Sequence, residues 1–251
     1  MAIQRTPDLT RNKPDPHSGK RKRRIVFIPW DFSEGQEWVI KTHQWNHATK
    51  NKYEIVNHTP RMPSRILWEA STDPACSIYI RGHGNPGIPY IQVKIGDGDV
   101  TQKILITEAC QRLIDNGLTR SFPGVIKFFH CHSATILTRA EYNNEKERIK
   151  RKNQYFKEAC KGRLITKKQR DEWIESLYPN KSIARNGADF LRKKGFTKCS
   201  YYGYLGPLAS EYGDDGDGGF HKLAEINGLQ SRPTHLVNVV TSRASQARIQ
   251  V

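Results

Sequence analysis

Two runs of strand-forming residues, with one helical segment between them, most constrain what this chain can fold into. The first run ends at His83 and the second at Cys131, and both are rich in Ile, Val, Tyr and Phe. Between them, residues 107–114 space their apolar side chains as a helix does, and Gly117 supplies a stop signal. A strand, a crossover helix and a second strand predict a parallel pair. We therefore expect the two strand ends to lie at the same edge of one sheet.

Other segments carry the same α/β signals. Residues 25–30 form a continuous apolar run, which is typical of a strand buried on both faces. We expect further helices at 36–50 and 184–194, further strands at 53–58, 199–205 and 235–240, and loops at 85–101 and 211–219. The predicted fold is a three-layer α/β/α sandwich in which helices flank a mostly parallel sheet.

The domain organisation follows from composition. Residues 1–23 are polar, basic and contain prolines, so we expect a disordered basic leader. One domain is expected over 24–251, because this length buries a substantial core without disulfides. Residues 139–180 are rich in Lys, Arg and Glu with interspersed apolar side chains, and we interpret them as a basic helical insertion in that domain.

The compartment is predicted from what the sequence lacks. The chain has five cysteines, an odd number without paired metal-ligand spacing, so neither a disulfide framework nor a zinc knuckle is expected. No run approaches the roughly 18 apolar residues of a membrane span. We expect a soluble cytoplasmic protein without a transmembrane segment, with nuclear or secreted-effector destinations left open.

A formal net charge of +16 predicts an acidic or phosphate-rich partner. One alternative function is therefore a non-enzymatic polyanion-binding or nucleic-acid-binding protein. The sequence contains no ribonucleoprotein-type strand motif, zinc finger or helix-turn-helix that would specify such a protein.

Two short motifs resemble the catalytic blocks of caspase-like (clan CD) cysteine peptidases. They are Ile-Tyr-Ile-Arg-Gly-His-Gly at 78–84 and Ile-Lys-Phe-Phe-His-Cys-His-Ser-Ala at 126–134. His83 precedes Cys131 by 48 residues, close to the separation of about 50 in caspases. The caspase sequence Gln-Ala-Cys-x-Gly is missing, so the motifs are more similar to bacterial members of the group, and Asp specificity is not implied.

The resemblance implies a caspase-like sheet and a cysteine endopeptidase that acts on proteins or peptides through a His-Cys dyad. Cys131 would be the nucleophile and His83 would transfer the proton, while the N–H groups of Gly84 and Cys131 would form the oxyanion hole. No cofactor is required. Some bacterial relatives are activated by inositol hexakisphosphate, so a polyphosphate activator is a further expectation, as is self-processing within the basic insertion.

The substrate pocket maps by the same resemblance to Asp31, Phe129 and Glu211. Two of these three residues are acidic, which favours a basic substrate side chain through charge-assisted hydrogen bonds.

A metal-dependent hydrolase is the second alternative. His130 and His132 are two residues apart, so on a strand they would share a face, and His83 would be a third ligand. A purely structural role for Cys131 is the alternative to both enzymatic functions, because a cysteine in an apolar strand is most often a small buried hydrophobic residue. Cys76, Cys110, Cys160 and Cys199 keep that interpretation.

Overall fold

The structure is a computed structural model of the 251-residue chain. It describes residues 22–49, 52–86, 89–95, 101–136, 143, 181–205, 208–214, 220–225, 241–243 and 248–251.

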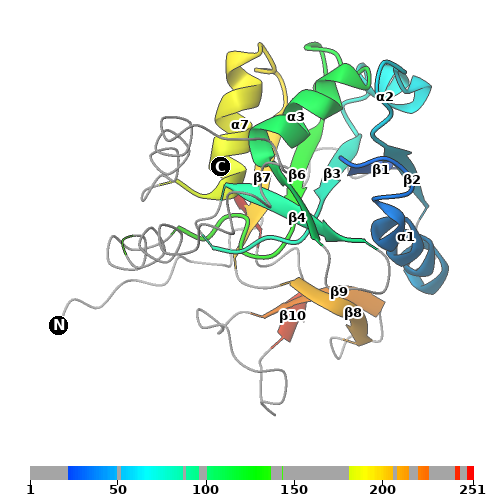
Figure 1. The fold of residues 1–251 in the computed structure, drawn as a ribbon, viewed down its shortest axis with the longest axis vertical. Coiled ribbons are helices and arrows are strands. Elements are labelled where there is room, and N and C mark those ends of the chain that lie inside the picture. Colours follow the sequence, from blue (N-terminus) through cyan, green and yellow to red (C-terminus); the bar gives the residue numbers. More distant parts are fainter. Residues whose placement is uncertain are drawn as a thin grey trace.

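A six-stranded sheet forms the centre of the molecule (Figure 1). Its strands, in spatial order, are β11 (Arg248–Gln250), β7 (Ser200–Tyr204), β6 (Val125–Phe129), β3 (Ser77–Arg81), β1 (Arg24–Ile28) and β2 (Tyr53–Asn57). All neighbours pair in parallel except β11, which runs antiparallel to β7. The prediction of a mixed α/β fold with a mostly parallel sheet is confirmed, including the parallel pair β3 and β6.

Four helices pack around this sheet in the described part of the chain. They are α1 (Gln36–Thr49), α2 (Arg65–Ala70), α3 (Ile106–Asp115) and α7 (Ile183–Lys193). The predicted helices at 36–50, 107–114 and 184–194 are confirmed, and Gly117 and Gly195 follow two of them with positive φ, as C-terminal stop residues do. The short helix α2 was not predicted, because its six residues give too little periodicity to register.

Neighbouring side chains of β6 show how the helices are placed. Phe129 stacks on Trp45 of α1, with ring centroids 5.6 Å apart. A Cβ on Gly187 of α7 would lie 2.3 Å from the Phe128 ring, so α7 approaches the sheet as closely as a glycine allows. Successive residues of a strand point to opposite faces, so α1 and α7 contact opposite faces of the sheet.

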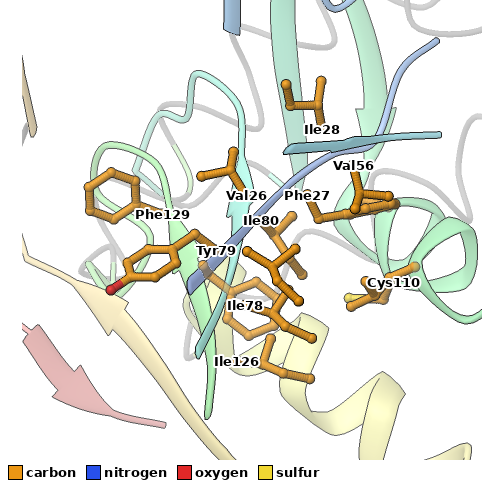
Figure 2. Close-up of a cluster of buried hydrophobic side chains, with 14 of the residues drawn as sticks. Val26, Phe27, Ile28, Val56, Ile78, Tyr79, Ile80, Cys110, Ile126 and Phe129 are labelled. Carbon is orange, nitrogen blue, oxygen red and sulfur yellow. The ribbon is translucent and has the colours of Figure 1, made fainter. Parts of the chain in front are cut away.

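The hydrophobic core also has two parts, one on each face of the sheet. Figure 2 shows Tyr79 and Phe129 together on one side, with Ile78, Ile126 and Cys110 gathered on the other. Cys110 belongs to α3, which lies beside α7 in Figure 1. The central strands are thus buried on both faces, as the continuous apolar run at residues 25–30 predicts for β1.

Two smaller sheets include strands where the sequence predicts loops. The strand β4 (Tyr90–Lys94) lies within the predicted loop 85–101, and it pairs in a hairpin with β5 (Thr101–Leu105), which begins at the end of that loop. The strand β8 (Leu208–Asp214) extends into the predicted loop 211–219 and pairs with β9 (Phe220–Glu225), which pairs with β10 (Thr241–Arg243). Both loop predictions were wrong in these parts, because glycine and charge clusters masked short strands whose pairing partners decide their conformation.

Three predictions fall outside the described residues: most of the leader 1–23, the helical insertion at 139–180 except for residue 143, and the strand at 235–240. Within the described part, no helix combines the length and the apolar character needed to cross a membrane.

Candidate active site

The register of β3 and β6 brings His83 and Cys131 to one edge of the sheet. Arg81 and Phe129 form the last register pair of these parallel strands. His83 and Cys131 each lie two residues beyond that pair, at the carboxyl ends where ligands bind in open α/β sheets. Both residues line one cavity. Both strand ends therefore lie at the same edge of the sheet and border one cavity, as the sequence predicts for a parallel pair.

Four elements contribute to the wall of this cavity. Helix α1 supplies Trp38 and Lys41, and the segments that end β3 and β6 supply most of the rest. The lining residues are Trp38, Lys41, Arg81, Gly82, His83, Phe129, His130, Cys131 and Leu208.

The backbone of His83 is held by the β4–β5 hairpin. Its N–H donates to the carbonyl of Gln92 at 2.7 Å, and the Gln92 N–H donates back at 3.0 Å. The Trp38 ring lies against the imidazole, with centroids 4.6 Å apart. These contacts fix the position of the histidine from two sides.

Glu37 of α1 is the carboxylate partner of His83. The Nε2 atom of His83 lies 3.0 Å from one Glu37 oxygen and 3.3 Å from the other. Lys41 donates to the same carboxylate at 2.5 Å, and the Lys94 N–H donates at 3.2 Å. Burial alone would raise the pKa of Glu37, but the hydrogen bonds from His83 and Lys41 outweigh it and lower the pKa to about 2.

This arrangement fixes the tautomer of His83. A Glu37 carboxylate only accepts hydrogen bonds, so Nε2 carries the proton and Nδ1 is the nitrogen left to exchange protons in the cavity. Sequence reasoning did not identify Glu37. Its only signal was an acidic residue in the first turn of a helix, which is common and is explained by the helix dipole alone.

Cys131 is the partly exposed cysteine among the four that the structure describes. The N–H of Leu208 points to its sulfur at 3.2 Å, and the carbonyl of the same residue lies 3.6 Å from the sulfur. In contrast, burial raises the pKa of Cys76, Cys110 and Cys199, which keeps these cysteines as inert thiols, in agreement with the structural interpretation.

The chain turns sharply after Cys131. His132 has φ of +54°, a left-handed conformation that is uncommon outside glycine. The buried hydroxyl of Ser133 accepts a hydrogen bond from the Tyr204 N–H at 2.7 Å, and the Ser133 carbonyl accepts one from Ala184 at 2.8 Å. The loop that follows β6, residues 130–134, is thus tied both to β7 and to the start of α7.

Gly84 lies where no side chain fits. A Cβ there would be 2.5 Å from Nδ1 of His130 and 2.7 Å from the Cys131 carbonyl oxygen. This close approach explains why glycine follows the histidine. The expected role of the Gly84 N–H in an oxyanion hole stays a prediction.

The three predicted substrate-binding residues differ in outcome. Phe129 lines the cavity. Asp31 does not: its carboxylate caps a turn, accepting hydrogen bonds from the Ser33 hydroxyl at 2.7 Å and the Glu34 N–H at 2.8 Å. Glu211 lies within β8 rather than in a loop, and its side chain is outside the described residues.

The metal-ligand arrangement proposed for His83, His130 and His132 is not formed. Among the described residues, no group of three or more His, Cys, Asp or Glu side chains could hold a metal ion. The prediction that His130 and His132 share a strand face is wrong, because β6 ends at Phe129 and the chain turns at His132.

Comparisons of this chain with protein-family models, with curated proteins and with solved structures find no match.

Proposed function

We propose that this protein is a cysteine endopeptidase in which Cys131 is the nucleophile, His83 the acid-base group and Glu37 the residue that orients His83. One observation carries the proposal: a thiol and a carboxylate-bound imidazole, from the ends of adjacent parallel strands, line the same cavity. This is the arrangement of a nucleophile, a base and a third group that orients the base.

In the first half of the reaction, the Cys131 thiolate attacks the carbonyl carbon of a peptide bond. The carbonyl oxygen becomes an oxyanion, which the N–H groups of Gly84 and Cys131 stabilise. The carbon–nitrogen bond then breaks, and protonated His83 donates the proton from Nδ1 to the leaving amine. The products are a thioester on Cys131 and the free amine.

In the second half, His83 accepts a proton at Nδ1 from a water molecule that attacks the thioester. The carbon–sulfur bond breaks, the peptide acid leaves, and the Cys131 thiolate is restored. Glu37 accepts the hydrogen bond from Nε2 throughout and stabilises the imidazolium form of His83.

The caspase-like, three-layer form of the fold belongs to this proposal. Its support is the placement of α1 and α7 against opposite faces of a mostly parallel sheet, with the site at the carboxyl ends of the central strands.

Peptide-library cleavage tests the proposal. The purified full chain is incubated with a diverse peptide library under reducing conditions, with and without chelator, beside Cys131→Ala. We expect cleavage that resists the chelator and falls by at least about 1000-fold in the variant, because the nucleophile is lost.

Cys199→Ala is the matched control, because Cys199 is buried and lies outside the cavity. It should cleave at the wild-type rate. Undiminished cleavage by a folded Cys131→Ala protein would rule out the assignment, and loss of cleavage on adding chelator would favour the metal-dependent alternative.

A further inference from the structure

The edge of the central sheet opposite Cys131 is where three of its parallel strands begin. β3, β6 and β7 start there in register, with Ser77 beside Val125 and Val125 beside Ser200. We call it the amino edge, and Cys131 follows the other end of β6. Figure 1 shows the ends of α2, α3 and α7 along this edge, at the top, whereas β8, which reaches the cavity through Leu208, lies at the bottom.

The loop from α3 to β6 joins its two neighbours at the amino edge into one surface. The Thr119 N–H donates to the Ser71 hydroxyl at 3.0 Å, and the Ser121 hydroxyl donates to the Ser71 carbonyl at 3.3 Å. These bonds hold the loop against the end of α2. On the other side, a Cβ on Gly195, just after α7, would lie 3.0 Å from Cδ of Arg120. The surface therefore runs from α2 across this loop to the end of α7.

Cations without an acidic partner gather on this surface. Arg120, Lys193 and Lys198 are exposed, and in the described part of the chain none of their side chains has an ion pair or a hydrogen bond. Lys194 is also exposed, and its Nζ lies 5.4 Å from the ring centroid of Phe190. Like charges held this close repel one another, so binding an anion here is favourable.

The other cations of α7 and its flank are neutralised by Asp189. Its carboxylate pairs at 3.0 to 3.4 Å with Lys181, Arg185 and Arg192. The dipole of α7 favours cations in its last turn, which accounts in part for Lys193 and Lys194. It does not account for Arg120 or Lys198, which lie outside the helix.

The carboxylates described near the amino edge do not cancel this charge. Glu69 accepts hydrogen bonds from Arg65 at 2.7 Å and from Arg23 at 3.3 Å, so its charge is already balanced. Asp73 and Asp115 remain, and they accept hydrogen bonds from uncharged donors. Four cations therefore face two carboxylates among the described residues of this surface.

Trp68 adds an aromatic ring at the α2 end of the surface. Its side chain is 66% exposed, while Leu67 and Ala70 of the same helix are buried. No ring stacking or cation contact joins it to another described residue. A tryptophan this exposed is uncommon, because a large apolar ring is left in water. Its π face is open to a planar group of a ligand.

We infer that the amino edge binds a single-stranded nucleic acid, with phosphates on Arg120, Lys193, Lys194 and Lys198 and a base stacked on Trp68. Proteins that bind single strands without sequence preference combine cations that track the backbone with an aromatic ring that stacks on a base. An acidic peptide would satisfy the cations but would bring no base to the indole. The inference goes beyond the proposed peptidase function and does not depend on it.

Fluorescence anisotropy tests the cationic part of the surface. The full chain is titrated into labelled oligothymidylate or oligouridylate of about 12 nucleotides, between about 50 and 200 mM sodium chloride. Each neutralised phosphate of a single strand contributes about −0.7 to the slope of log K against log salt, so four predict a slope of about −3. Arg120→Gln should make this slope less steep by about 0.7.

The stacking part has a different signature. Trp68→Ala should weaken binding roughly 5- to 150-fold and leave the salt slope unchanged, because stacking releases no counterions. Ile40→Ala is the control for the lost apolar surface, since Ile40 is 49% exposed on α1. Lys181→Gln, at the other end of α7, is the control for the lost charge. Both controls should bind as the wild type does, and thermal melting checks that every variant is folded.

No binding at the lowest salt would overturn the inference. Binding that neither Trp68→Ala nor Arg120→Gln alters would also overturn it, because another part of this basic chain would then hold the strand. Displacement by polyglutamate at the same charge concentration as by unlabelled oligonucleotide would overturn it in favour of an acidic protein partner. Equal affinity for the two oligonucleotides supports recognition of backbone and base face alone, and a preference for one identifies the strand as DNA or RNA.

Discussion

At the scale of single residues, the site depends on Glu37 more than its sequence position suggests. Glu37 orients His83 through Nε2 and is itself held by Lys41. We expect Glu37→Gln to lower kcat/KM by about 10- to 100-fold, because misplacing a catalytic group by about 1 Å costs this much. Steady-state cleavage of the best library peptide measures the effect. Glu108→Gln, which removes an exposed helical carboxylate, is the control and should be neutral.

The same carboxylate makes stability depend on pH. The pKa of Glu37 is about 2 in the folded protein and 4.5 without its partners, so the folded state binds fewer protons between these values. Its stabilising contribution is complete above pH 4.5 and is lost as the pH falls toward 2. Urea denaturation measures the free energy of unfolding at pH 6 and at pH 3. The decrease in this free energy from pH 6 to pH 3 should be smaller for Glu37→Gln than for wild type. An equal loss in both proteins would contradict this account.

Gly84 offers a steric test of the site. An alanine Cβ would meet Nδ1 of His130 at 2.5 Å and the Cys131 carbonyl oxygen at 2.7 Å, and the latter is backbone that cannot rotate away. We expect Gly84→Ala to cost about 1–3 kcal/mol of stability and to reduce cleavage at least about 10-fold. Denaturant titration and the peptide assay measure the two effects.

Gly195→Ala is the contrasting substitution. Gly195 has φ of +94°, and a Cβ there would meet only the flexible end of Arg120, at 3.0 Å. It should cost about 1 kcal/mol through backbone strain and leave the kinetics unchanged. Equal kinetic effects of the two substitutions would mean that Gly84 has no special place beside the nucleophile.

At the scale of elements, the loop after β6 is held by side-chain hydrogen bonding where strand pairing ends. The register between β6 and β7 runs from Val125 to Lys127, and the Ser133 hydroxyl then accepts the Tyr204 N–H at 2.7 Å. Ser133 is completely buried. The Ser133 hydroxyl therefore accepts the hydrogen bond that a strand carbonyl would otherwise accept, and it fixes the loop at residues 130–134 against β7.

Removing this hydroxyl should be costly. Ser133→Ala leaves a buried Tyr204 N–H without its acceptor, and we expect a loss of about 1–3 kcal/mol in the free energy of unfolding, measured by urea denaturation. Ser121→Ala removes an exposed hydroxyl bonded to Thr119 and should stay within about 0.5 kcal/mol of wild type. An unchanged free energy of unfolding in Ser133→Ala would show that this hydrogen bond does not stabilise the loop.

The sequence predicts the elements that carry a local signal and misses those that depend on distant partners. The strands leading to His83 and Cys131 are runs of strand-forming residues, and both helices with glycine stops were predicted close to their bounds. The β4–β5 hairpin was not, because its two strands stabilise each other across a loop. The residues of the candidate site differ in the same respect. His83 and Cys131 follow strands that the sequence predicts, whereas Glu37 lies 46 residues from His83, and no local pattern in the sequence relates the two.

At the scale of the whole molecule, the net charge of +16 predicts salt-dependent binding of polyphosphates. We expect inositol hexakisphosphate to raise the melting temperature saturably at physiological salt, by about 5 °C at 100 times Kd. A thermal shift titration measures this, with equal ionic strength from sodium chloride as the control. A melting temperature that does not change, or that rises without saturating, would rule out inositol hexakisphosphate as a specific ligand.

The parallel register of β3 and β6 fixes where His83 and Cys131 lie relative to each other. It runs from Ser77 opposite Val125 to Arg81 opposite Phe129. The relative position of His83 and Cys131 is set by the backbone ladder between β3 and β6 and not by the length of the chain that joins them. The loops of the crossover, outside the β4–β5 hairpin that holds His83, can therefore lengthen or shorten over evolutionary time without moving the two side chains. One residue inserted within either strand would shift a partner by about 3.3 Å and turn its side chain to the other face. On the proposed peptidase function, selection should tolerate gaps in the loops of the crossover and forbid them in the seven residues that end at His83 and in the seven that end at Cys131.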